Sequence, residues 1–282
     1  MAELNFPDPV VSQEYETPDV PDVKWTWDGV KWESFILRLQ NMGGLPILNT
    51  TDDFQTVTSG VRPDDTPNPF LKIPGNGGST SDVIGGISMS GNNISSTSDS
   101  PFYGSAMRFN SGSLTGPQFD TRFYVGGSTK LTLEGWFNFD NPAFQDPANF
   151  LYNYLWTQYG FTDDNQGWEV TIVDSKPQFF WWAPDGTQNN IDSGQALAAN
   201  TWYHIAVVFD DNNVKIFIDG SMKANSSFST PGYGSRADQP QQFNIGCTFY
   251  DDGRQSETTG KYLDLTGYSA VKYTEDFVLP SL

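Results

Sequence analysis

Apolar and polar residues alternate most clearly between positions 201 and 220. The first part, Trp202 to Phe209, is rich in the β-branched and aromatic residues that favour strands. The last part, Val214 to Ile218, has an apolar residue at every second position, so these side chains share one face of a strand. The Asp-Asp-Asn-Asn cluster between them favours a turn, because such side chains bond to nearby backbone. The pattern predicts a β-hairpin, which needs a larger sheet around it to be stable.

Similar patterns predict further strands downstream of position 70. In residues 130–139 the odd positions are apolar or glycine and face one way, while the even positions, Glu134 among them, face the other. We interpret the aromatic-rich residues 140–168 as a long insertion. No amphipathic helical pattern exceeds about three turns, so the chain is predicted to be all-β. The predicted strands cover residues 70–73, 87–90, 122–125, 130–139, 168–173, 178–182, 242–246, 260–265 and 271–280.

We interpret the first 40 residues as a separate module. Four prolines between positions 7 and 21 rule out a helix there. Trp25 and Trp27 alternate before an Asp-Gly turn, and Trp32 follows on the returning strand, which predicts a small hairpin. Residues 41–69 lack periodicity and are rich in glycine and proline, so we interpret them as an extended linker arm. The predicted β-domain occupies residues 70–282.

The central hairpin also carries a family resemblance. The runs Trp202-Tyr203-His204-Ile205-Ala206-Val207 and Val214 to Gly220 resemble the signature hairpin of laminin-G-like, concanavalin A-like jelly rolls. Glu134-Gly135-Trp136 and Lys272-Tyr273-Thr274 match two further strands of that family, with Lys272 in place of an arginine. Leu265 and Thr266 follow Asp264 where the family usually carries an acid and then an arginine. The resemblance spans about residues 70–282 and implies an antiparallel jelly-roll β-sandwich.

A second resemblance concerns the N-terminal module. Leu4 to Pro7, Tyr15 and the run Trp25 to Trp32 resemble the N-terminal module of structural proteins of tailed bacteriophages. It implies a virion protein, either a capsid decoration protein or a tail or fibre component, made in the host cytoplasm. The implied partners are other virion proteins and further copies of the chain, with a trimer fitting fibre modules of this kind. The alternative is a hairpin that docks on its own domain. The implied anchor residues are Phe6, Tyr15, Trp25, Trp27 and Trp32.

Composition and charge narrow the function classes. The chain has 282 residues and a formal net charge of −19, which argues against binding to a nucleic-acid backbone. No apolar run reaches the length of a membrane span. The N-terminus lacks the basic region and apolar core of a signal peptide. The single cysteine, Cys247, excludes an internal disulfide and is expected to be buried.

Acidic loop clusters make calcium the candidate cofactor. Calcium takes six to eight oxygen ligands, which loops rich in aspartate and asparagine supply. The same residues also suit turn formation without any metal. The candidate ligands are Asp163, Asp164, Asp210, Asp211, Asp251 and Asp252.

Aromatic residues near polar loops suggest a host surface glycan as a candidate partner. Alternation places one of Trp181 and Trp182 toward the core and the other outward. Exposed rings of this kind can equally contact a neighbouring subunit. The candidate glycan-binding residues are Tyr152, Tyr159, Trp181, Trp182 and Asp185.

Catalysis is not expected. His204 is the only histidine, and its place inside a strand favours a packing role. A glycosidase needs two carboxylates that flank the scissile bond. Glu134 precedes glycine and tryptophan instead of the acidic spacing of glucanases, and Glu169 has no acidic partner at strand spacing. The alternatives to a virion protein are a soluble calcium-dependent lectin and, less favoured, a glycoside hydrolase.

Overall fold

The computed structural model describes residues 14–16, 23–27, 32–36, 67–84, 86–146, 151–160, 166–233, 242–249 and 255–279. The chain divides into two compact units, Met1–Asp65 with Leu282, and Thr66–Ser281. Apart from two short 3-10 turns, the regular elements in the described ranges are β-strands. No helix in those ranges has the length and apolar character that crossing a bilayer requires.

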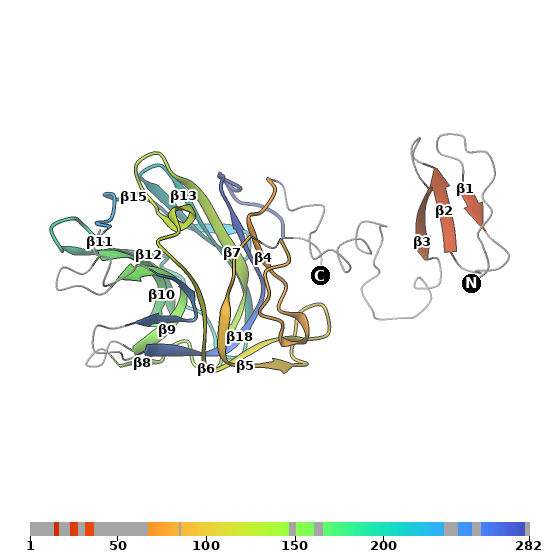
Figure 1. Ribbon diagram of the computed structural model, residues 1–282, viewed down its shortest axis with the longest axis horizontal. Coiled ribbons are helices and arrows are strands. Elements are labelled where there is room, and N and C mark those ends of the chain that lie inside the picture. The colour runs from red at the N-terminus through yellow and green to blue at the C-terminus, as the bar shows by residue number, and fades with distance from the viewer. Residues whose placement is uncertain are drawn as a thin grey trace. The chain divides into compact units, whose positions relative to one another are not determined.

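The first unit contains a three-stranded antiparallel sheet in the order β1-β2-β3 (Figure 1). β2 (Val23–Trp27) and β3 (Trp32–Ile36) form the predicted hairpin, with Trp27 opposite Trp32. β1 (Glu14–Glu16) was not predicted and places Tyr15 opposite Trp25. Phe6 and residues 41–66 lie outside the described ranges. The anchor role of this module and the division of the chain at positions 40 and 69 stay predictions.

The second unit is an antiparallel jelly-roll β-sandwich, as predicted. One continuous path of strands, β12-β11-β10-β9-β16-β6-β18-β7-β13-β14-β15, curves to form its layers (Figure 1). β4 and β17 add to β18, β5 to β6 and β8 to β9. The strands are β4 (Leu71–Ile73), β5 (Ser90–Thr97), β6 (Ala106–Gln118), β7 (Lys130–Phe139), β8 (Gln145–Asp146), β9 (Leu151–Gly160), β10 (Gln166–Val173), β11 (Lys176–Trp182), β12 (Gln188–Asp192), β13 (Trp202–Asp210), β14 (Asn213–Ile218), β15 (Ser221–Ser227), β16 (Gln242–Ile245), β17 (Cys247–Phe249) and β18 (Gln255–Tyr268).

The predicted central hairpin is confirmed as β13 and β14. Phe209 lies opposite Val214 and Asp210 opposite Asn213, so the turn consists of residues 211 and 212. Asp211 adopts a φ of 56°, a conformation that aspartate and asparagine tolerate better than most residues. The other edge of β13 pairs with β7 along its whole length, which places the hairpin inside the larger sheet that it needs.

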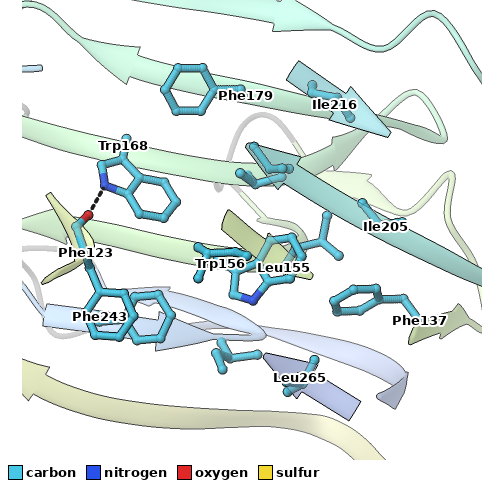
Figure 2. Close-up of a cluster of buried hydrophobic side chains, with 14 of the residues drawn as sticks. Phe123, Phe137, Leu155, Trp156, Trp168, Phe179, Ile205, Ile216, Phe243 and Leu265 are labelled. Carbon is cyan, nitrogen blue, oxygen red and sulfur yellow. Dashed lines mark hydrogen bonds between the residues drawn. The ribbon is translucent and has the colours of Figure 1, made fainter. Parts of the chain in front are cut away.

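The core between the layers is aromatic. Phe123 stacks on Phe243 with ring centroids 3.5 Å apart, and the buried indole of Trp168 donates a hydrogen bond to the carbonyl oxygen of Phe123 at 2.8 Å (Figure 2). Phe137 and Trp156 meet edge to face, 5.1 Å between centroids. The odd positions of β7 face this core as predicted, apart from Gly135, which has no side chain to contribute.

Four local predictions were wrong. Residues 121–123 form a 3-10 turn, η3 (Thr121–Phe123), because the Asp120 carboxylate accepts the backbone N–H of Arg122 at its start. The strand expected at 87–90 begins at its last residue and continues to position 97. Residues 140–168 are not a simple insertion, since they include β9, whose Tyr154 and Trp156 are fully buried. Residues 271–279 contain no strand.

The C-terminal segment, residues 269–279, covers the non-core face of β7, β13 and β14. That face is apolar at Ala206, Val208 and Phe217. Tyr273 and Phe277 stack at 3.6 Å and pack against it. Alternate positions of β7 and β13 are therefore buried on both faces of the sheet.

Gly220 fixes one end of this segment, and its replacement by alanine should destabilise the protein. Gly220 has a φ of 76°, and its carbonyl oxygen accepts the backbone N–H of Phe277 at 2.8 Å. A Cβ at this position would lie 2.1 Å from the carbonyl oxygen of Phe277. We expect Gly220→Ala to lower the free energy of unfolding by about 2–3 kcal/mol, from backbone strain and displacement of the segment. Denaturant titration measures it.

Gly127→Ala is the matched control. Gly127 has a φ of 65°, yet a Cβ there would have no atom within 4 Å, so only the conformational cost applies. Equal losses of unfolding free energy in the two variants would show that the clash between the added Cβ and the carbonyl oxygen of Phe277 contributes nothing.

Candidate functional site

A buried polar cluster surrounds Glu134 on the non-core face of β7. Glu134 is 6% exposed. Its Oε1 accepts hydrogen bonds from Lys272 Nζ at 2.7 Å and from the Tyr268 hydroxyl at 2.9 Å. Its Oε2 accepts one from the Tyr273 hydroxyl at 2.6 Å. Lys272 and Tyr273 belong to the C-terminal segment, so this cluster fastens that segment to the sheet.

His204 lies beside this carboxylate. Its Nε2 is 3.6 Å from Glu134 Oε2, and its backbone N–H donates to Asp219 Oδ1 at 2.9 Å. Burial lowers the pKa of His204 more than the nearby Glu134 carboxylate raises it. Burial alone would raise the pKa of Glu134, but the interactions with His204, Lys272 and the Tyr273 hydroxyl hold that pKa below its usual value. The packing role expected for His204 stays a prediction.

A second buried ion pair joins β4 to β18. Lys72 Nζ lies 2.8 Å from Asp264 Oδ1, and the Lys72 side chain is 1% exposed. Lys72 therefore supplies a cation beside Asp264. The arginine that the family usually carries after this acid is absent from the sequence. The sequence does not reveal this pair, because Lys72 is almost 200 positions from Asp264 and β4 pairs with β18 only in the folded sheet.

The polar face of the sandwich, defined here by Thr157, Glu169, Phe180 and Asn244, is the candidate functional site. The strand registers align Phe180, Glu169, Thr157 and Asn244 in one row across β11, β10, β9 and β16. Trp168 and Val170 flank Glu169 in β10 and pack in the core. Side chains alternate between the faces of a strand, so Glu169 points away from the core.

Glu169 is the unusual member of this row. It is 7% exposed, and its carboxyl group makes no hydrogen bond or ion pair to any residue in the described ranges. Burial raises its pKa to about 8. At neutral pH the group is therefore largely protonated, and it can both donate and accept a hydrogen bond.

The polar neighbours of Glu169, Thr157 and Asn244, are hydrogen-bonded in part. Thr157 Oγ1 donates to the carbonyl oxygen of Cys247 at 3.0 Å. Asn244 Nδ2 donates to the carbonyl oxygen of Gln242 at 3.1 Å and approaches Thr157 Oγ1 at 3.4 Å. Asn244 Oδ1 is buried and has no hydrogen-bond partner. An unpaired buried acceptor of this kind costs folding free energy.

The two adjacent tryptophans take opposite faces, as alternation predicts, but both are buried. Trp181 packs in the core and its Nε1 donates to Ser229 Oγ at 2.9 Å. Trp182 lies on the polar-face side and is only 7% exposed, so the expectation of an open ring there was wrong. Its cross-strand neighbour in β10 is Gly167, and a glycine leaves room for a large ring to lie close to the sheet.

The other candidate glycan residues are dispersed. Tyr152 is half-buried in β9, with its ring 6.3 Å from that of Tyr154. Tyr159 is also in β9, opposite Gly167 of β10. Asp185 lies in the loop between β11 and β12, where its Oδ1 accepts the backbone N–H of Thr187 at 2.9 Å. Of the five predicted residues, all but Asp185 lie in β9 or β11, the strands that pair with β10 on either side of Glu169.

The calcium prediction stays open. Asp163, Asp164, Asp251 and Asp252 lie outside the described ranges. Asp210 pairs with Lys130, and Asp211 Oδ1 is 3.5 Å from the same amine. Within the ranges that the structure describes, no group of three or more histidine, cysteine or acidic residues could hold a metal ion.

Three solved structures with a similar fold are an arabinanase domain and two neurotoxin binding domains. Domain 4 of AbnA, a GH43 extracellular arabinanase from Geobacillus stearothermophilus solved with arabinotriose, aligns with a TM-score of 0.53 at 15% identity, covering 72% of this chain and 93% of that one. The binding domain of botulinum neurotoxin serotype G aligns at 0.49 and 14%, covering 72% of this chain and 48% of that one. The receptor binding domain of the C/D mosaic neurotoxin aligns at 0.49 and 12%, covering 74% and 49%.

This chain spans about half the length of those neurotoxin domains. At such low identity the structural likeness concerns the fold alone. No curated protein sequence matches the chain. Residues 110–274 match the laminin-G-like family described as the concanavalin A-like lectin/glucanases superfamily. Because this match covers more than half of the sequence, the chain belongs to the concanavalin A-like lectin/glucanases superfamily.

Proposed function

We propose that this chain is a structural protein of a tailed-bacteriophage virion, a capsid decoration protein or a tail or fibre component, that displays its β-sandwich for adhesion to host surface glycans. The observation that carries the adhesion part is the unpartnered carboxyl group of Glu169 on the polar face. The virion part rests on the resemblance of the N-terminal residues to phage structural modules.

The chemistry of the polar face suits a sugar. A sugar presents hydroxyl groups that donate and accept hydrogen bonds, together with an apolar ring face. The Glu169 carboxyl group, 7% exposed, makes no hydrogen bond or ion pair to the residues that the structure describes, so it can hydrogen-bond to a ligand. Phe180, next to Glu169 in the row, is a half-buried aromatic ring that can contact a ring face. A few placed polar groups beside aromatic surface are typical of ligand sites.

The output of this site is binding and not hydrolysis. Hydrolysis of a glycosidic bond requires a pair of carboxyl groups roughly 5–9.5 Å apart. Glu134 is occupied by Lys272 and two tyrosines beneath the C-terminal segment. The cross-strand neighbours of Glu169 are Phe180 and Thr157, neither of which is acidic.

Attachment is assigned to the first unit. Its three-stranded sheet is a compact unit separate in the chain from the β-sandwich. Tryptophans are the residues most enriched at the energetic centres of protein interfaces, and this short sheet contains three. Other virion proteins, and further copies of the chain in a homo-oligomer such as a trimer, are the partners in this proposal.

Deletion of residues 1–40 tests the two parts together. We expect the shortened chain to lose association with phage particles, measured by co-sedimentation, while it keeps its binding to host cells. The triple variant Trp25→Ala, Trp27→Ala, Trp32→Ala is the full-length control and should show the same loss. Unchanged association of both proteins would refute the attachment role. Calcium-dependent sugar binding without any particle association would favour the lectin alternative.

A further inference from the structure

We infer that the side chains of Lys72 and Asp264 join in an isopeptide bond, which links β4 at the start of the β-sandwich to β18 near its end. Such a bond is an amide between the two side chains, and it forms with loss of one water molecule. This inference goes beyond the proposed function, because it concerns how the sandwich is held together and not what it binds. It follows from the burial of the pair, from its distance and from the place of the two strands in the chain.

The two reacting groups are buried and close. The amine nitrogen of Lys72, Nζ, lies 2.8 Å from Asp264 Oδ1. The Lys72 side chain is 1% exposed and that of Asp264 is 10% exposed. The carboxyl carbon is one bond beyond Oδ1, so Nζ lies within about 4 Å of the atom that it would attack, close to the separation of a reactive conformer.

Strand pairing holds the backbone of both residues in place. The two residues that flank Lys72 in β4 pack in the core, so Lys72 points to the opposite face of the sheet. Thr266 of β18 lies opposite Lys72. Asp264 is two positions before Thr266, and its backbone N–H donates to the carbonyl oxygen of Pro74 at 3.0 Å. The fold therefore positions the amine and the carboxyl group beside each other, and such positioning lowers the barrier between two reactants.

The reaction balances without a further reagent. Proton transfer from the Lys72 ammonium to the Asp264 carboxylate gives a neutral amine and a neutral carboxylic acid, which burial favours over two charges. Nζ then forms a bond to the carboxyl carbon, and the bond from that carbon to one oxygen breaks. The oxygen leaves as water, with the acid proton and one proton from Nζ. The product is a neutral secondary amide, so both buried charges disappear.

The buried pair of Lys272 and Glu134 provides a comparison. Glu134 accepts hydrogen bonds from Lys272 and from the hydroxyls of Tyr268 and Tyr273. Hydrogen bonds to a carboxylate favour its ionised form, and the pKa of Glu134 lies below its usual value. An amine attacks an ionised carboxylate poorly, because the carbon then carries no neutral leaving group. Lys272 is therefore expected to stay unlinked.

The bond would strengthen the sandwich where the first unit joins it. β4 has three residues and pairs with β18 at three positions. The chain runs from the first unit into β4 before any other strand of the sandwich, so a pull along the chain from that unit reaches β4 first. A link between Lys72 and Asp264 also closes a loop of almost 200 residues. In the chain-entropy model, a long closed loop restricts the unfolded chain more than a short one.

Intact mass spectrometry of the denatured full-length protein tests the bond. We expect the main species to be lighter than the unlinked chain by one water molecule. Digestion with trypsin should give a branched peptide that joins the segment around Lys72 to the segment around Asp264. Lys72→Met and Asp264→Ala should each show the full mass of the variant chain, whereas Lys272→Met should keep the loss of one water.

Three results would overturn the inference. A wild-type protein that is folded by circular dichroism and has the full mass contains no isopeptide bond, and this result needs no variant. Loss of water through a cyclic imide at an Asp-Gly step would leave the chain unbranched and would persist in Lys72→Met. A loss of water that disappears in Lys272→Met and persists in Lys72→Met would place the bond at Glu134. None of these results depends on glycan binding or on particle association, so the proposed function is tested separately.

Discussion

Replacement of Lys272 by methionine is expected to lower the free energy of unfolding by about 3–5 kcal/mol. The variant would leave the Glu134 carboxylate buried without its cationic partner, and the two tyrosine hydroxyls cannot supply a charge. It would also loosen the C-terminal segment that covers Ala206, Val208 and Phe217. For a domain of this size, the loss corresponds to a fall in Tm of roughly 10 °C. Calorimetry and urea titration measure both quantities.

Two further variants show whether burial of the ion pair causes the expected loss of stability in Lys272→Met. The double variant Glu134→Gln, Lys272→Met removes both charges and should recover much of the loss, because no lone charge stays buried. Lys130→Met breaks an ion pair whose lysine side chain is 49% exposed, and should change stability little. A loss in Lys130→Met as large as that in Lys272→Met would argue against the effect of burial.

The stability advantage of Glu169→Gln over wild type should grow as pH rises from 5 to 8. Burial raises the pKa of Glu169 to about 8 in the folded protein, whereas an unfolded glutamate ionises near 4.5. The folded chain therefore retains a proton that the unfolded chain releases. The stability that protonated Glu169 contributes is fully present only below pH 4.5. It falls by about 1.4 kcal/mol per pH unit in this window, about 3–5 kcal/mol in all, and levels off above pH 8.

Urea unfolding at pH 5, 7 and 9 measures this difference between the two proteins. Glutamine cannot ionise and keeps nearly the same volume, so subtraction isolates the titration of residue 169. Glu275→Gln, at an exposed position of the C-terminal segment, is the control for the substitution itself. A wild-type curve parallel to that of Glu169→Gln would mean that the carboxyl group titrates normally and that the polar face is open to water.

The sequence predicts this fold well where alternation is regular. β7, β13 and β14 have clear two-residue periods, and each was identified within one or two residues. β9 was missed because a β-bulge opposite Thr171 puts both Leu155 and Trp156 in the core, which breaks the period of two. Residues 271–279 have the composition of a strand but form hydrogen bonds through side chains and through Gly220 instead.

The candidate site was predicted only in part. The alternation of Trp168, Glu169 and Val170 indicates that Glu169 leaves the core, but not that its surroundings exclude water. That property depends on the neighbours that pairing brings together, Thr157 and Phe180, from strands whose register the sequence does not specify. The burial of Trp182 was missed for the same reason, since its fit beside Gly167 follows from pairing.

The late position of the C-terminal segment has a consequence for biosynthesis. Val271, Tyr273 and Phe277 shield strands that are translated more than 50 residues earlier. In the nascent chain, the apolar non-core face of β13 and β14 therefore stays uncovered until the segment emerges from the ribosome. During that interval the uncovered sheet is a target for chaperones and for other nascent copies.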